Sequence, residues 1–167
     1  MKRSLSSPPV WLAASGLIAF LAGCNTKRSD TETASAGAAA ATTTNEKVWI
    51  TTSSDEARTL YTQGRALAEQ LKAHDARKLF EQAVAKDPSF ALAHYSLALS
   101  SATTKDFFQH LNRAVALSDK ASEGERLMIL AAQAGSNADP TKALAYAEEL
   151  VAKYPQDERA HFILAGN

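Results

Sequence analysis

Residues 57–88, ARTLYTQGRALAEQLKAHDARKLFEQAVAKDP, decide the fold of this chain. Apolar and small residues recur at helical spacing through both halves of the stretch, which predicts two amphipathic helices at about 55–71 and 75–86. Asp87-Pro88 ends the pair because proline cannot continue a helix. The apolar positions of the first helix are Ala57, Leu60, Gly64, Leu67 and Leu71, and those of the second are Ala76, Leu79, Phe80, Ala83 and Val84.

Two related units follow this pair, at about 91–120 and 123–155, and residues 156–167 form the first helix of a partial fourth unit. The second unit is about three residues shorter between its helices, and it has Ser118-Asp119-Lys120 in place of the closing proline. The third opens with the capping-box pattern Ser122 to Glu125. The sequence therefore predicts an all-α array of helix pairs.

The order Leu60-x₂-Gln63-Gly64-x₂-Leu67, Ala76-x₃-Phe80 and Pro88 resembles a tetratricopeptide repeat. The resemblance implies an α-solenoid of about three repeats across 47–167, with units at 57–90, 91–120, 123–155 and a partial one at 156–167. Small residues, Gly64 and Ala76, are expected where helices cross closely, and Phe80 between neighbouring repeats. An unrelated helical bundle would share the composition but not the recurrence.

The N-terminus carries a second pattern, in which Lys2 and Arg3 precede an apolar run from Val10 to Ala22. The run is shorter than the about 20 residues that span a bilayer. Leu21-Ala22-Gly23-Cys24 then resembles the lipobox of bacterial lipoproteins, and Cys24 is the only cysteine. The alternatives are a core helix, an uncleaved anchor, or cleavage at Ala34-Ser35-Ala36.

The lipoprotein resemblance implies that residues 1–23 are removed and that Cys24 receives a diacylglyceryl group, usually with an N-acyl chain such as palmitate. The partner of the anchor is then a membrane, and the protein lies in the cell envelope. Asn25 favours the outer membrane, while the periplasmic face of the inner membrane stays open.

Residues 24–46 contain few aliphatic side chains and are rich in Thr, Ser, Ala and Gly, which predicts a flexible linker after the lipidated cysteine. A coil of this length reaches roughly 26 Å. The apolar piece Val48-Trp49-Ile50 is predicted to pack against the start of the array. Ser53 and Glu56 fit a capping box at its first helix.

Nothing in the sequence indicates catalysis. The 18 basic and 18 acidic residues balance, so nucleic acid is not an expected partner. His74, His94, His110 and His161 have no metal-ligand spacing, and His74 is predicted to lie in a turn. There is no nucleophile elbow or phosphate loop. We therefore expect no enzyme, no metal, no cofactor besides the acyl lipid, and no small-molecule substrate.

The remaining hypothesis is a groove for a protein or peptide, formed by the first helices of the repeats. It predicts a basic and aromatic end and an apolar middle, suited to a peptide with acidic and apolar side chains. The alternative is that these residues serve surface and inter-repeat packing. The predicted residues are Arg58, Tyr61, Arg65, Glu69, Leu92, Tyr95, Leu99 and Met128, with Glu125 and Ala132 beside them.

Two functions fit this sequence. One is a membrane-anchored scaffold that binds a protein partner in the envelope. The other is the regulatory part of a longer protein whose further region carries a different activity.

Overall fold

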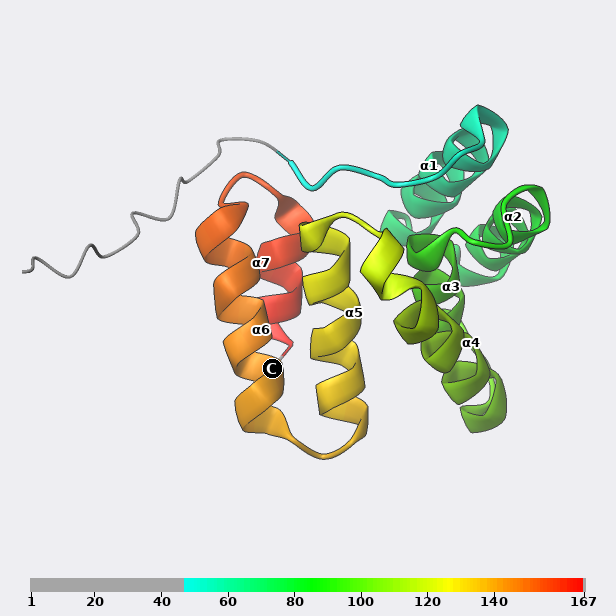
Figure 1. The fold of residues 1–167 in the computed structure, drawn as a ribbon. Helices are drawn as coiled ribbons and strands as arrows, with labels where there is room; N and C mark the ends of the chain where they lie inside the picture. The colour runs from blue at the N-terminus through cyan, green and yellow to red at the C-terminus, as the bar shows by residue number, and fades with distance from the viewer. Residues whose placement is uncertain (1–46, 167) are drawn as a thin grey trace, which may run out of the picture. The chain divides into compact units, whose positions relative to one another are not determined.

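The computed structural model describes residues 47–166, so the predicted signal segment, Cys24 and the whole predicted linker lie outside the described residues. Within residues 47–166 the chain forms helices and no strands, which confirms the all-α prediction (Figure 1). The elements are α1 (Asp55–Glu69), α2 (Ala73–Lys86), α3 (Ala91–Leu99), α4 (Thr104–Leu117), the 3₁₀ turn η1 (Ser118–Lys120), α5 (Glu123–Ser136), α6 (Pro140–Lys153) and α7 (Glu158–Ala165).

The helices pack as consecutive pairs. The most extensive contacts join α1 to α2, α3 to α4, and α5 to α6, and each pair stacks on the next through α2–α3, α4–α5 and α6–α7. Figure 1 shows these pairs side by side, with α7 beside α5 and α6. This is the helical-repeat solenoid that the sequence predicts, and η1 occupies the place of the missing proline after the second pair.

The first pair crosses at Gly64, as predicted. A Cβ atom at Gly64 would lie 2.6 Å from Cε1 of Phe80 and 3.2 Å from the backbone oxygen of Ala76. The Phe80 ring then packs on Tyr61, with ring centroids 5.7 Å apart, and Tyr61 packs on Phe90 at 5.1 Å. Because Phe90 precedes α3, this aromatic chain joins the first repeat to the second.

The prediction of a capping box at the start of α1 is wrong. The side chain that caps α1 is Ser54, whose Oγ accepts from the amide of Ala57 at 3.1 Å. Ser53 instead donates to Asp87, and Glu56 pairs with Lys86 at 2.9 Å, so their capping box does not form. By contrast, the Ser122–Glu125 box at the start of α5 is confirmed.

The expected apolar stripe of α1 is one residue too long. The helix ends at Glu69, and Leu71 lies beyond it with φ of 61° and 91 % of its surface exposed. The amide of Leu71 donates to the carbonyl of Ala68 and that of Lys72 to Leu67, which closes the helix end. The backbone at Leu71 is therefore left-handed, which turns its side chain away from the core.

The segment before α1 contradicts its predicted place. Residues 47–53, which we call the N-terminal strap, run extended across the array (Figure 1, cyan) rather than packing only at its start. Val48 is buried, and its amide donates to Asp157 at the beginning of α7, 2.8 Å away. At the other end of the strap, Thr52 and Ser53 donate to Asp87 between α2 and α3. The strap therefore links the first repeat to the last described helix.

Candidate functional site

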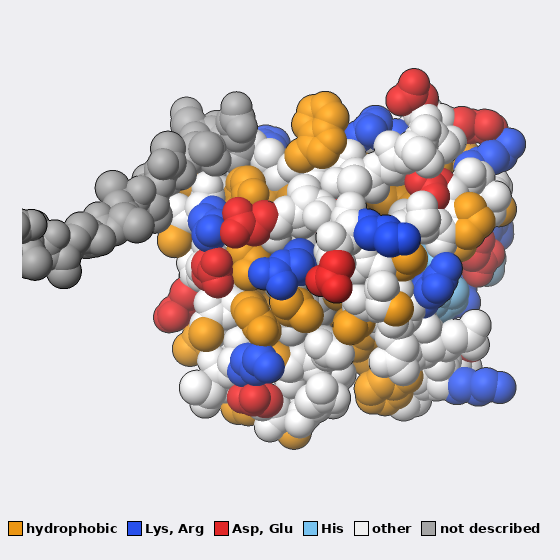
Figure 2. Space-filling model, in the orientation of Figure 1, with side chains coloured by type: hydrophobic (Ala, Val, Ile, Leu, Met, Phe, Trp, Pro, Cys, Tyr) orange, Lys and Arg blue, Asp and Glu red, His pale blue; other side chains and the backbone are white. Residues whose placement is uncertain are grey.

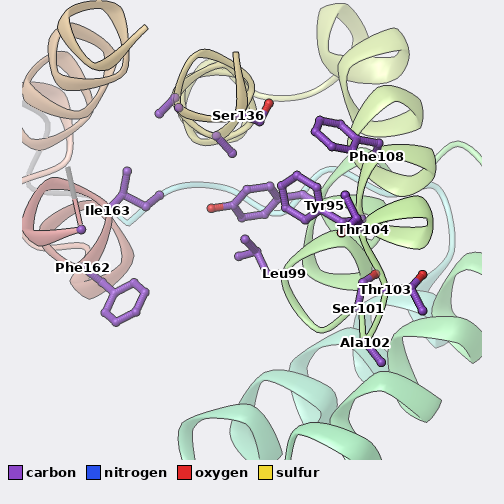
Figure 3. A pocket seen from close by; sticks show the side chains of 15 residues that line it. Tyr95, Leu99, Ser101, Ala102, Thr103, Thr104, Phe108, Ser136, Phe162 and Ile163 are labelled. Atoms are coloured by element: carbon purple, nitrogen blue, oxygen red, sulfur yellow. The ribbon is translucent and has the colours of Figure 1, made fainter. Parts of the chain in front are cut away.

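A groove opens among the first helices of the repeats (Figure 3). It encloses about 700 Å³ and lies between the end of α3, the start of α4, the second half of α5, and α7. The residues that line it are Tyr95, Leu99, Ser101, Ala102, Thr103, Thr104, Phe107, Phe108, Ala131, Ala132, Gly135, Ser136, Phe162, Ile163 and Gly166.

No charged side chain is among these lining residues. Leu99 and Phe162 have 58 % and 78 % of their surface exposed, which is unusual for large apolar side chains. The hydroxyls on the rim are turned to their own backbone: Thr103 caps α4 by accepting from Asp106, and Ser136 donates to the carbonyl of Gln133. The groove therefore offers mainly apolar and aromatic surface, the kind that marks interaction sites.

Tyr95 is the polar exception at the floor of the groove. Its side chain is largely buried, and burial raises the pKa of its phenol, so the hydroxyl stays protonated at neutral pH. Figure 3 shows this hydroxyl pointing across the groove toward Ile163 on α7. Among residues 47–166 the hydroxyl has no hydrogen-bond partner, so it is available to donate to, or accept from, a ligand.

The predicted groove residues divide into three sets, and the third, at the predicted basic end, is Arg58, Arg65 and Glu69. Tyr95 and Leu99 line the groove together with Ala132, and their role in binding a partner stays a prediction. The structure buries Tyr61, Leu92, Met128 and Glu125 among the helices, where a partner cannot reach them, so their assignment to an accessible groove is wrong.

The reason is the curvature of the array. Arg65 of α1 reaches Glu158 of α7, with Nη2 and Oε1 3.1 Å apart, so the inner face is closed at the end where α7 begins. Tyr61 lies inside this closure, hydrogen-bonded to Ser96, and burial raises its pKa. The sequence predicts which residues share one face of a helix but not the curvature of the array, because the curvature depends on how successive helix pairs stack.

The predicted basic end is also occupied from within. Arg58 donates to the carbonyls of Ile50 and Thr52 in the strap, and its guanidinium lies over the ring of Trp49. Arg65 pairs with Glu69 at 2.8 Å besides Glu158. Figure 2 shows basic and acidic side chains interspersed on this face, not gathered into a basic patch. The preference for acidic peptides therefore has no support from these residues.

Sequence reasoning missed the apolar walls of the groove, namely Phe107 and Phe108 at the start of α4, Gly135 in α5, and Phe162 and Ile163 in α7. One signal could have found the aromatic walls. In the second and fourth units these aromatic residues lie beside the buried face of the helix, at positions where a helix that faces water would carry polar residues.

His94 and His110 face each other between α3 and α4 with their Nδ1 atoms 3.5 Å apart, and burial lowers the pKa of both. His74 is the second residue of α2 and not a turn residue. Within residues 47–166 no group of three or more His, Cys, Asp or Glu could hold a metal ion. Over the same residues, no helix combines the length and apolar character needed to cross a bilayer.

Paired helices, short connections and a glycine at the crossing define a helical-repeat protein. A model of the tetratricopeptide repeat family matches residues 61–107, which run from within α1 to the start of α4. Residues 61–107 are therefore similar to a tetratricopeptide repeat, a type of unit that generally mediates protein–protein interaction. No curated protein and no solved structure matches the chain significantly.

Proposed function

We propose that the chain is an interaction scaffold of the bacterial cell envelope that binds an apolar segment of a partner protein in the groove of α3, α5 and α7. The observation that carries the proposal is the uncharged lining of that groove, with Leu99 and Phe162 largely exposed. Apolar surface of this extent is costly to leave in water, and a partner that covers it gains about 25 cal/mol per Å².

The geometry favours a ligand with uncharged side chains and one polar group. Apolar side chains suit the space between Leu99, Phe108 and Phe162. A backbone amide or carbonyl could pair with the hydroxyl of Tyr95, which otherwise lacks a partner among residues 47–166. A charged side chain in this space would lose its hydration without a counter-ion.

The membrane anchor is a separate part of the proposal. It is supported by the sequence pattern around Cys24, where an apolar run ends in Leu21-Ala22-Gly23. Diacylglycerol and N-acyl chains there would hold the array at the outer membrane, or at the periplasmic face of the inner membrane, since two or more chains anchor stably. Fatty-acid labelling of the wild type and of Cys24→Ser tests it, and equal labelling would refute it.

The groove is tested by placing a charge in it. Phe162→Glu should abolish capture of the partner in a crosslinking pull-down from envelope fractions, because the carboxylate would be buried on binding. Leu71→Glu is the matched control: it introduces the same charge at an even more exposed apolar residue, outside the groove. If both variants capture the same proteins as the wild type, the groove assignment is wrong.

A further inference from the structure

The last described helix, α7, is weakly held by apolar packing. It has eight residues, it packs mainly against α6, and Ala160 is its only buried side chain. Isolated helices of this length are marginal in water, so α7 depends on its surroundings for its position. Yet α7 supplies Phe162 and Ile163, which form one wall of the groove.

The strap holds α7 at its first turn. The amide of Val48 donates to Oδ2 of Asp157 at 2.8 Å, and the carbonyl of Val48 accepts from Nη2 of Arg159 at 2.8 Å. Asp157 is fully buried; burial disfavours its charged form, but donors from Arg159 and Val48 outweigh this and lower its pKa. The carboxylate is therefore ionised at neutral pH, and hydrogen bonds to charged groups are the stronger ones.

The same strap residue is fixed against α5. The side chain of Val48 fills the space above Gly124, where an added Cβ atom would lie 2.6 Å from either methyl group. A few residues further on, the amide of Thr51 donates to Glu125 and the hydroxyl of Ser122 donates to the carbonyl of Trp49, each at 2.8 Å. Val48 thus bridges the starts of α5 and α7.

The groove wall lies one turn below this bridge. Phe162 and Ile163 follow Arg159 by three and four residues, so they lie on the same side of α7 as the strap contact. A change of tilt at the first turn of a helix this short must move its second turn. We propose that Val48 of the strap and Asp157 are positioning residues that set the α7 wall of the groove without touching its ligand.

This inference rests on the proposed binding function, because the position of the α7 wall matters only for binding. Its test, however, needs no partner. In the full chain carrying Cys24→Ser, Val48→Gly removes the side chain that packs on Gly124 of α5 and so fixes the backbone bonds of the strap to α7. Trp49→Gly is the matched control, since it makes the same backbone change at the neighbouring strap residue, whose side chain is exposed. Asp157→Asn is the second variant: it keeps one oxygen to cap α7 and replaces the other acceptor by a donor. Asp139→Asn makes the same change at the cap of α6.

Hydrogen exchange should report the position of α7. We expect its amides to exchange about tenfold faster in Asp157→Asn, the loss expected for one hydrogen bond to a charged group. A similar acceleration is expected in Val48→Gly, because the backbone bonds of the strap to α7 lose the side-chain packing that fixes them, with α1–α4 and both controls unchanged. Nitroxides on cysteines at the exposed positions Gln109 of α4 and Ala165 of α7 should show a broader distance distribution in the same two variants.

Three results would overturn the inference. The first is exchange and distance distributions at α7 that match the wild type in both variants. The second is an equal response of the controls. The third is faster exchange in every helix, which would make the strap a general support rather than a positioning element. None of these results depends on a partner, so a failure here is distinguishable from a failure of the Phe162→Glu test.

Discussion

Replacing Gly64 by alanine tests the crossing on which the first repeat depends. The new methyl carbon would lie 2.6 and 2.8 Å from two carbons of the Phe80 ring, whereas carbon atoms in contact are about 3.5–4.0 Å apart. The ring must therefore retreat by about 1 Å. It has little room to do so, because Phe80 is buried against Tyr61 and the carbonyl of Ala76 limits a movement of α1 itself.

Two opposing effects set the magnitude. Alanine is favoured over glycine inside a helix by about 1 kcal/mol. Overpacking an enclosed site typically costs 1–3 kcal/mol, and we expect the upper end because the Phe80 ring is enclosed, which leaves a net loss of about 2 kcal/mol. Gly135 in α5 is the matched control, since an added Cβ atom there meets nothing within 4 Å. Gly135→Ala should therefore stabilise, by about 0.5–1 kcal/mol.

Urea and thermal unfolding of the full chain with Cys24→Ser, followed by circular dichroism, measure both variants. At about 4 °C per kcal/mol for a domain of this size, Gly64→Ala should lower Tm by about 8 °C and Gly135→Ala should raise it by about 2–4 °C. A Gly64→Ala variant as stable as the wild type, or more so, would show that the two helices can separate freely, and the reasoning about the crossing would fail.

Three further predictions use the same unfolding assay. Leu71→Gly should stabilise by about 1 kcal/mol, because φ of 61° strains a side chain that is exposed and packs on nothing, and an unchanged or lower stability would contradict this. The contribution of His94 and His110 to the free energy of unfolding should be fully present above the ordinary histidine pKa of about 6.5 and should fall as the pH drops below it. Burial lowers the pKa of both residues in the folded chain, so the unfolded chain takes up protons first. His110→Gln should flatten this dependence. Glu125→Gln should destabilise by about 2 kcal/mol, because one oxygen of this buried carboxylate accepts from the Ser122 amide and would be replaced by a donor.

The helix pairs were predictable from the sequence because their signals are local. The apolar period, the glycine at the crossing and the cap at Ser122 each involve residues within one helix pair. The errors were also local. Leu71 continues the apolar spacing, but α1 has already ended before it. The amide of Leu71 donates to the carbonyl of Ala68, and this bond closes the end of the helix. Hydrophobic spacing does not show where a left-handed residue ends a helix.

The strap and the closed end of the groove could not be predicted in this way. The bond from Val48 to Asp157 joins residues that are 109 positions apart, and the Arg65–Glu158 pair depends on the curvature accumulated over the intervening helices. In each pair, neither residue belongs to a sequence pattern that would identify its partner. As a result, Tyr95 and Leu99 of α3 line the groove, whereas Leu92 of the same helix and Tyr61 of α1 are buried.

The same closure decides which ligands the groove can select. An acidic peptide would have to displace Glu69 and Glu158 from Arg65, and remove Arg58 from two strap carbonyls, before it gained a pairing of its own. Exposed ion pairs contribute little free energy, so the new pairs with the peptide would stabilise the complex no more than the lost pairs stabilised the array. The contacts of the strap would also be broken. An apolar segment meets no such competitor between Leu99 and Phe162, where only water is displaced. In the proposed function we therefore expect uncharged side chains to provide the selectivity, because Arg58 and Arg65 already have partners within the array.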